Sequence, residues 1–180
     1  MTTTSENIII RKAAPADLDL VETIYNELHQ AEEDHQISVG WKRGIYPVRS
    51  TAEEALKRDD LFVLEYNGEI SGAGMINKIQ VDVYLEAPWE YEAEDDQICV
   101  LHTLVISPRV SGKGLGTRFV RFYEEYAKEH GCYELRLDTN ERNKAARAMY
   151  AKLGYKEISI VPTTFNGIPG VNLVLLEKKI

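Results

Sequence analysis

A glycine-rich loop is the feature that most limits how this chain can fold. Residues 111–116 read SGKGLG and separate an apolar run from a helical pattern. Glycines at alternate positions let the backbone curl so that its N–H groups converge. The first turn of the next helix adds unpaired N–H groups and the positive end of its dipole. Strand, loop and helix together predict a phosphate-binding cradle, and the alternative is a flexible glycine turn before a helix.

Hydrophobic periodicity on both sides of the loop predicts an α/β chain with a mixed sheet and helices packed on it. Strands are expected at residues 8–12, 61–66, 70–76, 98–106, 133–139, 158–161 and 171–176. Helices are expected from Leu18, from a capping box at Ser50-x-x-Glu53, from Leu115 to Gly131 and from Ala146 to Gly154. Asn67-Gly68 predicts a two-residue hairpin turn, whereas residues 162–170 read as a loop between the last two strands.

Length and composition favour one domain spanning residues 1–180. The 180 residues are 44% hydrophobic, enough to bury a core without disulfides or a structural metal. No apolar run approaches the roughly 18 residues that cross a bilayer, and the N-terminus lacks the pattern of a signal peptide, so a cytoplasmic protein is expected. Cys99 and Cys132 match no metal spacing, and His29 and His35 do not share a helical face; no metal site is expected.

The charge distribution limits the partners. The net charge of −8 argues against nucleic acid and against anionic membranes as partners. The charge is uneven, however, because 21 of the 29 acids precede residue 97, while 13 of the 21 basic residues follow residue 96. The half with the glycine loop is therefore net positive, which suits a small polyanionic cofactor.

Two other phosphate-binding motifs fit the loop less well. A Walker A motif needs Ser or Thr after Gly-Lys, and here Gly114 follows Lys113. A dinucleotide fold is the closer rival, since Gly112-x-Gly114-x-x-Thr117 nearly matches its fingerprint and Asp138 lies near where a ribose-binding acid would sit. Against it, the third position is threonine, and the strands before the loop form a hairpin rather than a βαβ unit.

The chain resembles the GNAT superfamily of acetyl-CoA-dependent N-acetyltransferases. The resemblance rests on the strand LHTLVISP, the loop SGKGLG and the run Asn143-x-x-Ala146-x-x-x-Tyr150-x-x-Leu153-Gly154-Tyr155. One position departs from the pattern, because Ser111 stands where the family has Gln or Arg. The resemblance implies a GNAT-like, mostly antiparallel sheet with a splayed central strand pair, and acetyl-CoA as cosubstrate.

The resemblance also implies where acetyl-CoA binds. The pantetheine arm would run along Leu104, Val105 and Ile106, in a gap between two splayed strands. Asn143 would cap a helix or contact the arm. The pyrophosphate would lie on the N–H groups of the loop, which comprises Ser111, Gly112, Lys113, Gly114, Leu115, Gly116 and Thr117.

Acetyl transfer to an amine needs a base, an oxyanion site and an acid for the leaving thiolate. Backbone N–H groups near Val105 and Ile106 can serve the oxyanion. Tyr150 occupies the family's position for the general acid, although its spacing also fits a core aromatic. His102 is the candidate base; strict alternation would place it on one strand face with Ile98, Val100, Leu104 and Ile106, where a hydrogen-bonded core histidine is the alternative.

The acceptor stays open at the level of sequence. In the family, residues 31–49 and 162–170 would set specificity. Trp41 and Tyr46 beside Lys42, Arg43 and Arg49 favour an amine that bears a carboxylate, such as an amino acid, whereas the acidic residues 86–96 favour a polyamine or are simply a solvated loop. The expected partner is a small-molecule amine, and a homodimer stays open. The alternative to an enzyme is a non-catalytic module that binds CoA or a dinucleotide.

Overall fold

The computed structural model describes residues 6–180, and their strands form one seven-stranded sheet. The sheet order is β1-β2-β3-β4-β5-β7-β6. The strands are β1 (Ile8–Lys12), β2 (Leu61–Tyr66), β3 (Glu69–Asn77), β4 (Ile98–Ile106), β5 (Glu134–Asn140), β6 (Lys156–Phe165) and β7 (Ile168–Lys179). The helices are α1 (Leu18–Glu33), α2 (Arg49–Lys57), α3 (Leu115–Glu129) and α4 (Lys144–Lys152). The α/β fold with a mixed, mostly antiparallel sheet is thus confirmed.

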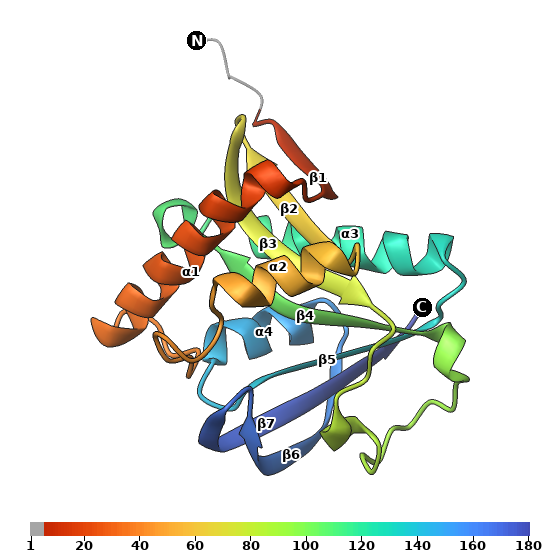
Figure 1. Ribbon diagram of the computed structural model, residues 1–180. Coiled ribbons are helices and arrows are strands. Elements are labelled where there is room, and N and C mark those ends of the chain that lie inside the picture. The colour runs from red at the N-terminus through yellow and green to blue at the C-terminus, as the bar shows by residue number, and fades with distance from the viewer. Residues whose placement is uncertain (1–5) are drawn as a thin grey trace.

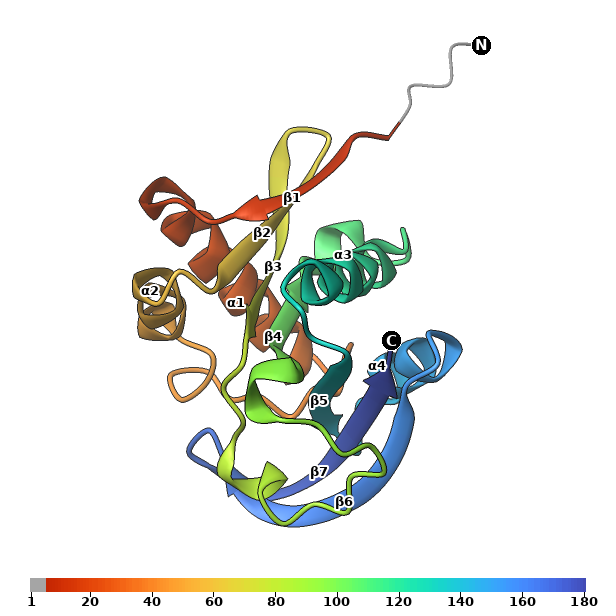
Figure 2. The same cartoon turned by 90° about the vertical axis from the view of Figure 1, so that its right-hand side faces the viewer.

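Helices cover both faces of the sheet (Figures 1 and 2). Helices α1 and α2 lie on one face, where Val21, Ile24 and Tyr25 pack against Val63 and Ala73. Helices α3 and α4 lie on the other face, and the side chains of α3 pack against β4 and β5. The apolar stripe that predicts each helix is therefore the surface that it buries. No helix within residues 6–180 is long and apolar enough to cross a membrane.

The central strands β4 and β5 separate along their length, as the resemblance implies. They pair in parallel from Ile98 with Glu134 to Leu101 with Leu137. Beyond Leu101, β4 keeps its pairing with β3, and beyond Leu137, β5 keeps its pairing with β7. Figure 1 shows the two strands diverging from that point. The split leaves one edge of each strand open toward the other.

A bulge in β4 separates Leu104 and Ile106 from the face on which strict alternation grouped them with His102. The register of β4 against β3 shifts between Ala73 and Met75, and Thr103 has a φ of 50°. An extra residue in one strand reverses the alternation of side chains beyond it. Cys99 and Leu101 face α3 before the bulge, and Leu104 and Ile106 do so after it, whereas Ile98 and Val100 pack on the opposite side. Strict alternation along 98–106 was therefore wrong.

Two further local predictions need correction. Residues 162–170 are not a loop, because β6 and β7 continue as a long hairpin whose turn is Asn166-Gly167, with φ of 50° and 75°. Pro162 is tolerated there because β6 is the edge strand. Helix α2 begins at Arg49 rather than after a Ser50 cap, and the Thr51 hydroxyl accepts a hydrogen bond from the Val48 N–H. The predicted hairpin turn at Asn67-Gly68 is confirmed.

Candidate active site

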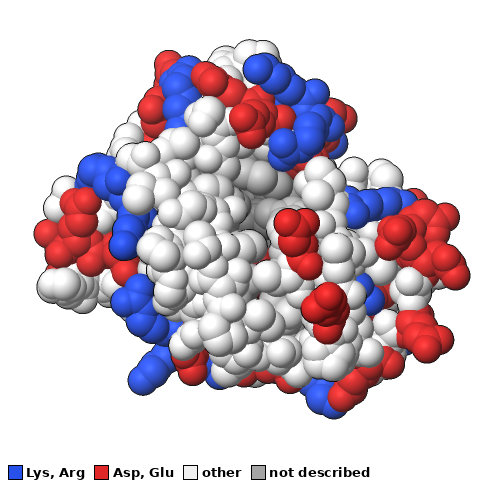
Figure 3. All heavy atoms as spheres, turned by 60° about the horizontal axis from the view of Figure 1, so that its bottom comes forward, with Lys and Arg blue, Asp and Glu red and all other residues white. Residues whose placement is uncertain are grey.

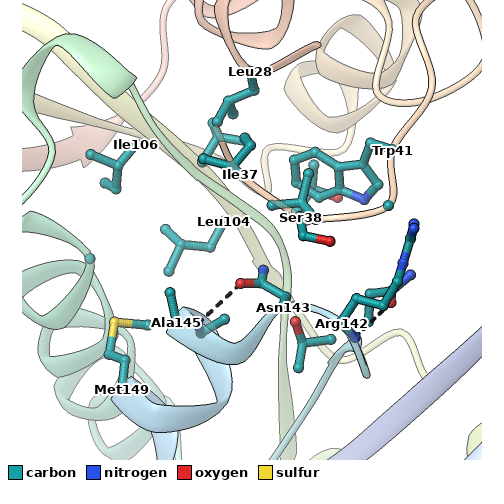
Figure 4. Close-up of a pocket in the computed structure, with 18 of the residues that line it drawn as sticks. Leu28, Ile37, Ser38, Trp41, Leu104, Ile106, Arg142, Asn143, Ala145 and Met149 are labelled. Atoms are coloured by element: carbon teal, nitrogen blue, oxygen red, sulfur yellow. Dashed lines mark hydrogen bonds between the residues drawn. The ribbon is translucent and has the colours of Figure 1, made fainter. Parts of the chain in front are cut away.

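A cavity of about 900 Å³ occupies the split between β4 and β5. One wall comes from β4, where Leu104 and Ile106 point toward Met149 of α4 (Figure 4). The segment between α1 and α2 covers the other side with Ile37, Ser38 and Trp41. Thr103, whose φ is strained for a β-branched residue, lies at the bulge, and its hydroxyl hydrogen-bonds the Tyr46 hydroxyl.

The glycine loop forms one end of this cavity. Gly112 and Gly114 have φ of 78° and 72°, which only glycine adopts without strain, and a Cβ on either would point into open space. Gly114 is the N-cap of α3, so the unpaired N–H groups of the first helical turn lie at the loop. At Gly116 a Cβ would lie 3.1 Å from Sδ of Met149. The backbone therefore leaves space for an anionic group at the start of α3.

The cavity brings together nearly all of the residues expected to bind the cofactor. Lys113 is the exception; it does not line the cavity, and its Nζ lies 5.5 Å from the centre of the Tyr66 ring. Asn143 caps α4, because its Oδ1 accepts a hydrogen bond of 3.1 Å from the Ala146 N–H. The lining residues from the expected set are Leu104, Val105, Ile106, Ser111, Gly112, Gly114, Leu115, Gly116, Thr117 and Asn143.

Tyr150 lines the cavity from α4. Its side chain is 5% exposed, and its ring packs edge-on against Tyr155 at 5.6 Å between centroids. Burial, followed by the nearby charge of Asp138, raises the pKa of the phenol above its usual value of 10.0. The hydroxyl therefore stays protonated through the neutral range, as a proton donor must.

His102 also lines the cavity, in a setting that weakens it as a base. Its Nε2 lies 2.9 Å from Oδ1 of Asn77, which can only accept, so Nε2 carries the proton. Burial lowers the pKa of the imidazole to about 4. At that value the ring is neutral near pH 7 and holds an added proton poorly. Its role as the general base stays a prediction.

Asp138 is a cavity residue that the sequence reasoning left out of the site. It is the first residue of β5 beyond the last pair with β4. Its Oδ2 accepts a hydrogen bond of 2.6 Å from the hydroxyl of Tyr84, in the short 3-10 helix η2 (Asp82–Tyr84). Burial raises the pKa of the carboxyl to about 6, and the Tyr84 hydrogen bond partly opposes this shift. The sequence pointed to Asp138 only as an acid near the ribose position of a dinucleotide fold and as one of the alternating polar residues of β5.

The two segments expected to set specificity both reach the cavity. The first contributes Trp41 and Tyr46, and the second contributes Phe165 and Asn166. The cations that favoured an amino-acid acceptor do not line it, however. Arg43 pairs with Glu33, and Arg49 pairs with Asp19, Glu22 and Glu53. Lys42 lies in a separate, smaller hollow.

The acidic residues 86–96 do not line the cavity either. They belong to the segment between β3 and β4, which lies over β7 and packs the partly buried Trp89 against Tyr84. Glu90 pairs with Lys156 on β6. The cavity is therefore lined neither by Lys42, Arg43 and Arg49 nor by the acids of residues 86–96.

A mixed sheet that opens between two parallel strands, beside a glycine loop at a helix start, is the arrangement that the resemblance to the GNAT family implies. The model of the acetyltransferase (GNAT) family matches residues 21–155, and the chain belongs to that family. An acetyltransferase of the GNAT family from Streptococcus agalactiae has the same fold, with a TM-score of 0.78 and 24% identity over 96% of this chain and 95% of that one. A second, YncA from Salmonella typhimurium with acetyl-CoA, has a TM-score of 0.68 and 17% identity over 96% and 94%.

Curated relatives cover only part of the chain. An uncharacterised N-acetyltransferase of Methanocaldococcus jannaschii is 30% identical over 108 residues, which is 59% of this chain and 44% of that protein. The N-acetyltransferase YjgM of Escherichia coli, also uncharacterised, is 30% identical over 97 residues, which is 54% of this chain and 51% of that protein. The chain thus spans about half the length of these two relatives.

Proposed function

We propose that this protein transfers the acetyl group of acetyl-CoA to a primary amine of a small molecule, with Tyr150 as the general acid. One observation carries the proposal: a single cavity joins the glycine loop at the start of α3 to Tyr150 on α4, along the open edge of β4. Family membership supports acetyl-CoA as the cosubstrate. The open edge of β4 suits an extended arm with amide groups, which can add to a strand.

The residues of the loop fit the phosphates of acetyl-CoA. Gly112 and Gly114 leave room where side chains would intrude, and the first N–H groups of α3 are preorganised donors. The nearby Arg109 is engaged elsewhere, because its Nε lies 2.8 Å from Oε1 of Glu27. In this proposal the phosphates are therefore bound mainly by backbone N–H groups and less by side chains of the loop.

Acetyl transfer requires the protein to stabilise an oxyanion and to protonate the leaving sulfur. Backbone N–H groups near Val105 and Ile106 would stabilise the oxyanion of the tetrahedral intermediate. As the carbon–sulfur bond breaks, Tyr150 would give its proton to sulfur and recover one from the amine nitrogen. A positioned acid of this kind contributes roughly 10²- to 10⁴-fold in rate.

Cofactor choice gives the first test. Purified protein is heated with acetyl-CoA, with CoA and with NAD, because a ligand at 100 times its Kd stabilises the folded state by roughly 2.7 kcal/mol. We expect acetyl-CoA to raise the melting temperature and NAD to leave it unchanged. A shift with NAD alone would point to a dinucleotide-binding module instead. Release of free thiol in the presence of an amine then separates an enzyme from a module that only binds CoA.

A further inference from the structure

Asp138 lies where its carboxylate could contact the acceptor amine. It lies at the point where β4 and β5 separate, on the same cavity as Tyr150. The tyrosyl groups of Tyr150 on α4 and Tyr46 before α2 both lie close enough to feel its charge. Its Oδ2 is held by Tyr84, and no hydrogen-bond partner for its Oδ1 is found within residues 6–180. One carboxylate oxygen is therefore fixed, and the other is free to accept a proton.

Tyr84 is itself held rigidly in place. Its ring is 1% exposed and packs edge-on against Trp89, whose Nε1–H donates to the Tyr84 carbonyl oxygen at 2.8 Å. The guanidinium of Arg136 lies 4.2 Å above the Trp89 ring. The segment between β3 and β4 thus fixes the direction of the Asp138 carboxylate before any ligand arrives, which is how a proton acceptor is preorganised.

The charges around the cavity single out this carboxylate. Asp138 is the only acid among the described residues that line it. The basic side chains Arg142 and Lys144 lie at the start of α4; Arg142 is 62% exposed and lies 3.9 Å from Glu32. An ammonium group that enters the cavity therefore meets one anionic partner, and a second ammonium on the same molecule would find none.

The wall beside Asp138 is apolar. It belongs to the hydrophobic cluster that β7 builds with the segment between β3 and β4. Figure 3 shows a face of the molecule where uncharged side chains fill most of the middle and charged ones gather toward the outline. The cavity residues from this cluster are Trp41, Tyr46, Val81, Phe165, Ile168, Val171 and Leu173. Such walls bind apolar and aromatic groups and leave a carboxylate without a partner.

We propose that Asp138 binds the ammonium of the acceptor and accepts its proton, and that the acceptor is a primary amine with an apolar or aromatic body and no carboxylate beside its nitrogen. The inference rests on the proposed acetyl transfer. An amine of pKa about 10.4 arrives protonated, so an anionic partner also orients it. The first proton passes from nitrogen to Asp138 and on to solvent. The nitrogen–carbon bond then forms, the carbon–sulfur bond breaks, and the second proton ends on sulfur through Tyr150.

Geometry and proton affinity agree on Asp138 over His102. Both line the cavity, but burial shifts their pKa values in opposite directions, to about 6 for the carboxyl and about 4 for the imidazole. The group with the higher pKa is the stronger base when the proton must come from an amine. The pH dependence of acetylation therefore distinguishes the two residues.

Two matched pairs of amines test the acceptor class. Phenylalanine adds only a carboxylate to 2-phenylethylamine, and 1,6-diaminohexane adds only a second ammonium to hexylamine. We expect kcat/KM to be at least about 100-fold lower for phenylalanine than for 2-phenylethylamine, because its carboxylate would face Asp138 in a desolvated site. We expect hexylamine to exceed the diamine by about 10-fold. A preference for phenylalanine or for the diamine would overturn the assigned class.

Three variants test the role of Asp138, with Asp82→Asn as the matched control. Asp82 lies exposed in η2 and outside the cavity, so its substitution removes the same charge near the site. We expect Asp138→Asn to lower kcat by roughly 10²- to 10⁴-fold. In the wild type, kcat/KM should fall below about pH 6. In Tyr84→Phe this fall should move to higher pH, because the Tyr84 hydrogen bond lowers the pKa of Asp138 and its loss raises that pKa. His102→Gln should leave the fall in place.

The outcomes separate this inference from the function on which it rests. Acetyl-CoA should stabilise Asp138→Asn as much as it stabilises the wild type, which shows that the fold and the cofactor site are intact. If Asp138→Asn acetylates amines as well as Asp82→Asn does, the role of Asp138 is overturned while acetyl transfer stands. If the wild type binds acetyl-CoA and acetylates no amine, both fail. If Asp138→Asn does not fold, Tyr84→Phe decides: an unmoved pH profile contradicts the assignment.

Discussion

The hydroxyl of Tyr84 donates a hydrogen bond of 2.6 Å to Oδ2 of Asp138 and so joins the segment between β3 and β4 to the split of the sheet. Asp138 is half-buried, where a carboxylate costs stability unless it is fully paired, and only one of its oxygens has a partner within residues 6–180. Asp138 is therefore a residue whose ionisation opposes folding, and its presence calls for a functional reason.

Replacing Asp138 by asparagine should stabilise the protein at neutral pH. Burial raises the pKa of this carboxyl from 3.8 to about 6, so the folded state binds the proton more tightly than the unfolded chain does. The contribution is fully present below about pH 4 and is lost as the pH rises through about 6. Asparagine keeps an acceptor for Tyr84 without the charge. We expect a gain of about 1–3 kcal/mol in the free energy of unfolding at about pH 7.5, and little at pH 4.

Urea unfolding of the variant and the wild type at the two pH values measures this gain. Asp82→Asn is the control, because the same change at an exposed site should alter stability by less than about 0.5 kcal/mol. A loss of stability in Asp138→Asn at neutral pH would show that the folded protein stabilises the anion, contrary to the raised pKa.

Tyr150→Phe should lower turnover without weakening the binding of acetyl-CoA. The substitution removes only the hydroxyl, and the ring keeps its contacts with Tyr155. We expect turnover to fall roughly 10²- to 10⁴-fold while the Kd of acetyl-CoA stays within about twofold. Calorimetry gives the affinity, and thiol release gives the turnover.

The neighbouring Tyr155 supplies a matched control. Its hydroxyl is buried, has no hydrogen-bond partner among residues 6–180 and does not reach the cavity. Tyr155→Phe should therefore keep full turnover and be neutral or stabilising, since it removes an unsatisfied polar group. Equal turnover in the two variants would remove Tyr150 from the mechanism.

The end of the cavity that the glycine loop forms could be predicted from the sequence because it is built from local features. The glycine loop, the start of α3 and the Asn143 cap each depend on a few neighbouring residues, and the structure brings them to one cavity. The hairpin at Asn67-Gly68 is of the same kind, because the turn residues themselves supply the positive φ angles.

The acceptor end depends on contacts between distant segments. Asp138 follows Glu134 and Arg136 in a polar alternation that is typical of a solvent-facing strand. That face is instead covered by residues 78–97, a segment without a clear period. The bulge at Thr103 likewise has no glycine or proline to signal it in the run ICVLHTLVI, so strict alternation misplaced Leu104 and Ile106.

Gly114→Ala should weaken acetyl-CoA binding beyond its effect on folding. Gly114 has a φ of 72° at the N-cap of α3, and Gly131 has a φ of 73° just past the other end of the helix. Alanine at either position costs about 1 kcal/mol through backbone strain. Only Gly114 lines the cavity. We expect at least about a tenfold rise in the Kd of acetyl-CoA for Gly114→Ala, because the cradle must shift.

Gly131→Ala is the control for strain, with a similar loss of stability and an unchanged Kd. Equal Kd values in the two variants would mean that the start of α3 does not hold the phosphates. Thermal unfolding without ligand confirms that the two substitutions are matched before their affinities are compared.

Glu134→Gln should stabilise the protein at alkaline pH. Glu134 and Glu177 are both buried, and their Oε2 atoms have no hydrogen-bond partner in the described part of the chain. Burial, together with the neighbouring Glu177, raises the pKa of Glu134 to about 8, despite Arg136 at 3.4 Å. Its contribution to stability is therefore present at low pH and is lost as the pH rises through about 8.

The neutral amide removes this loss, because it can donate a hydrogen bond to Glu177 at every pH. Between about pH 7 and pH 9, the wild type should lose stability while Glu134→Gln stays nearly level. Glu129→Gln, at the exposed end of α3, is the control and should follow the wild type.

Because Glu177 also accepts a hydrogen bond from the Glu90 N–H at 2.8 Å, ionisation of Glu134 should loosen the segment that holds Tyr84 against Asp138. Hydrogen exchange in residues 82–91 should accordingly rise with pH in the wild type more than in Glu134→Gln, once the intrinsic increase is subtracted. Parallel exchange in the two proteins would contradict this coupling.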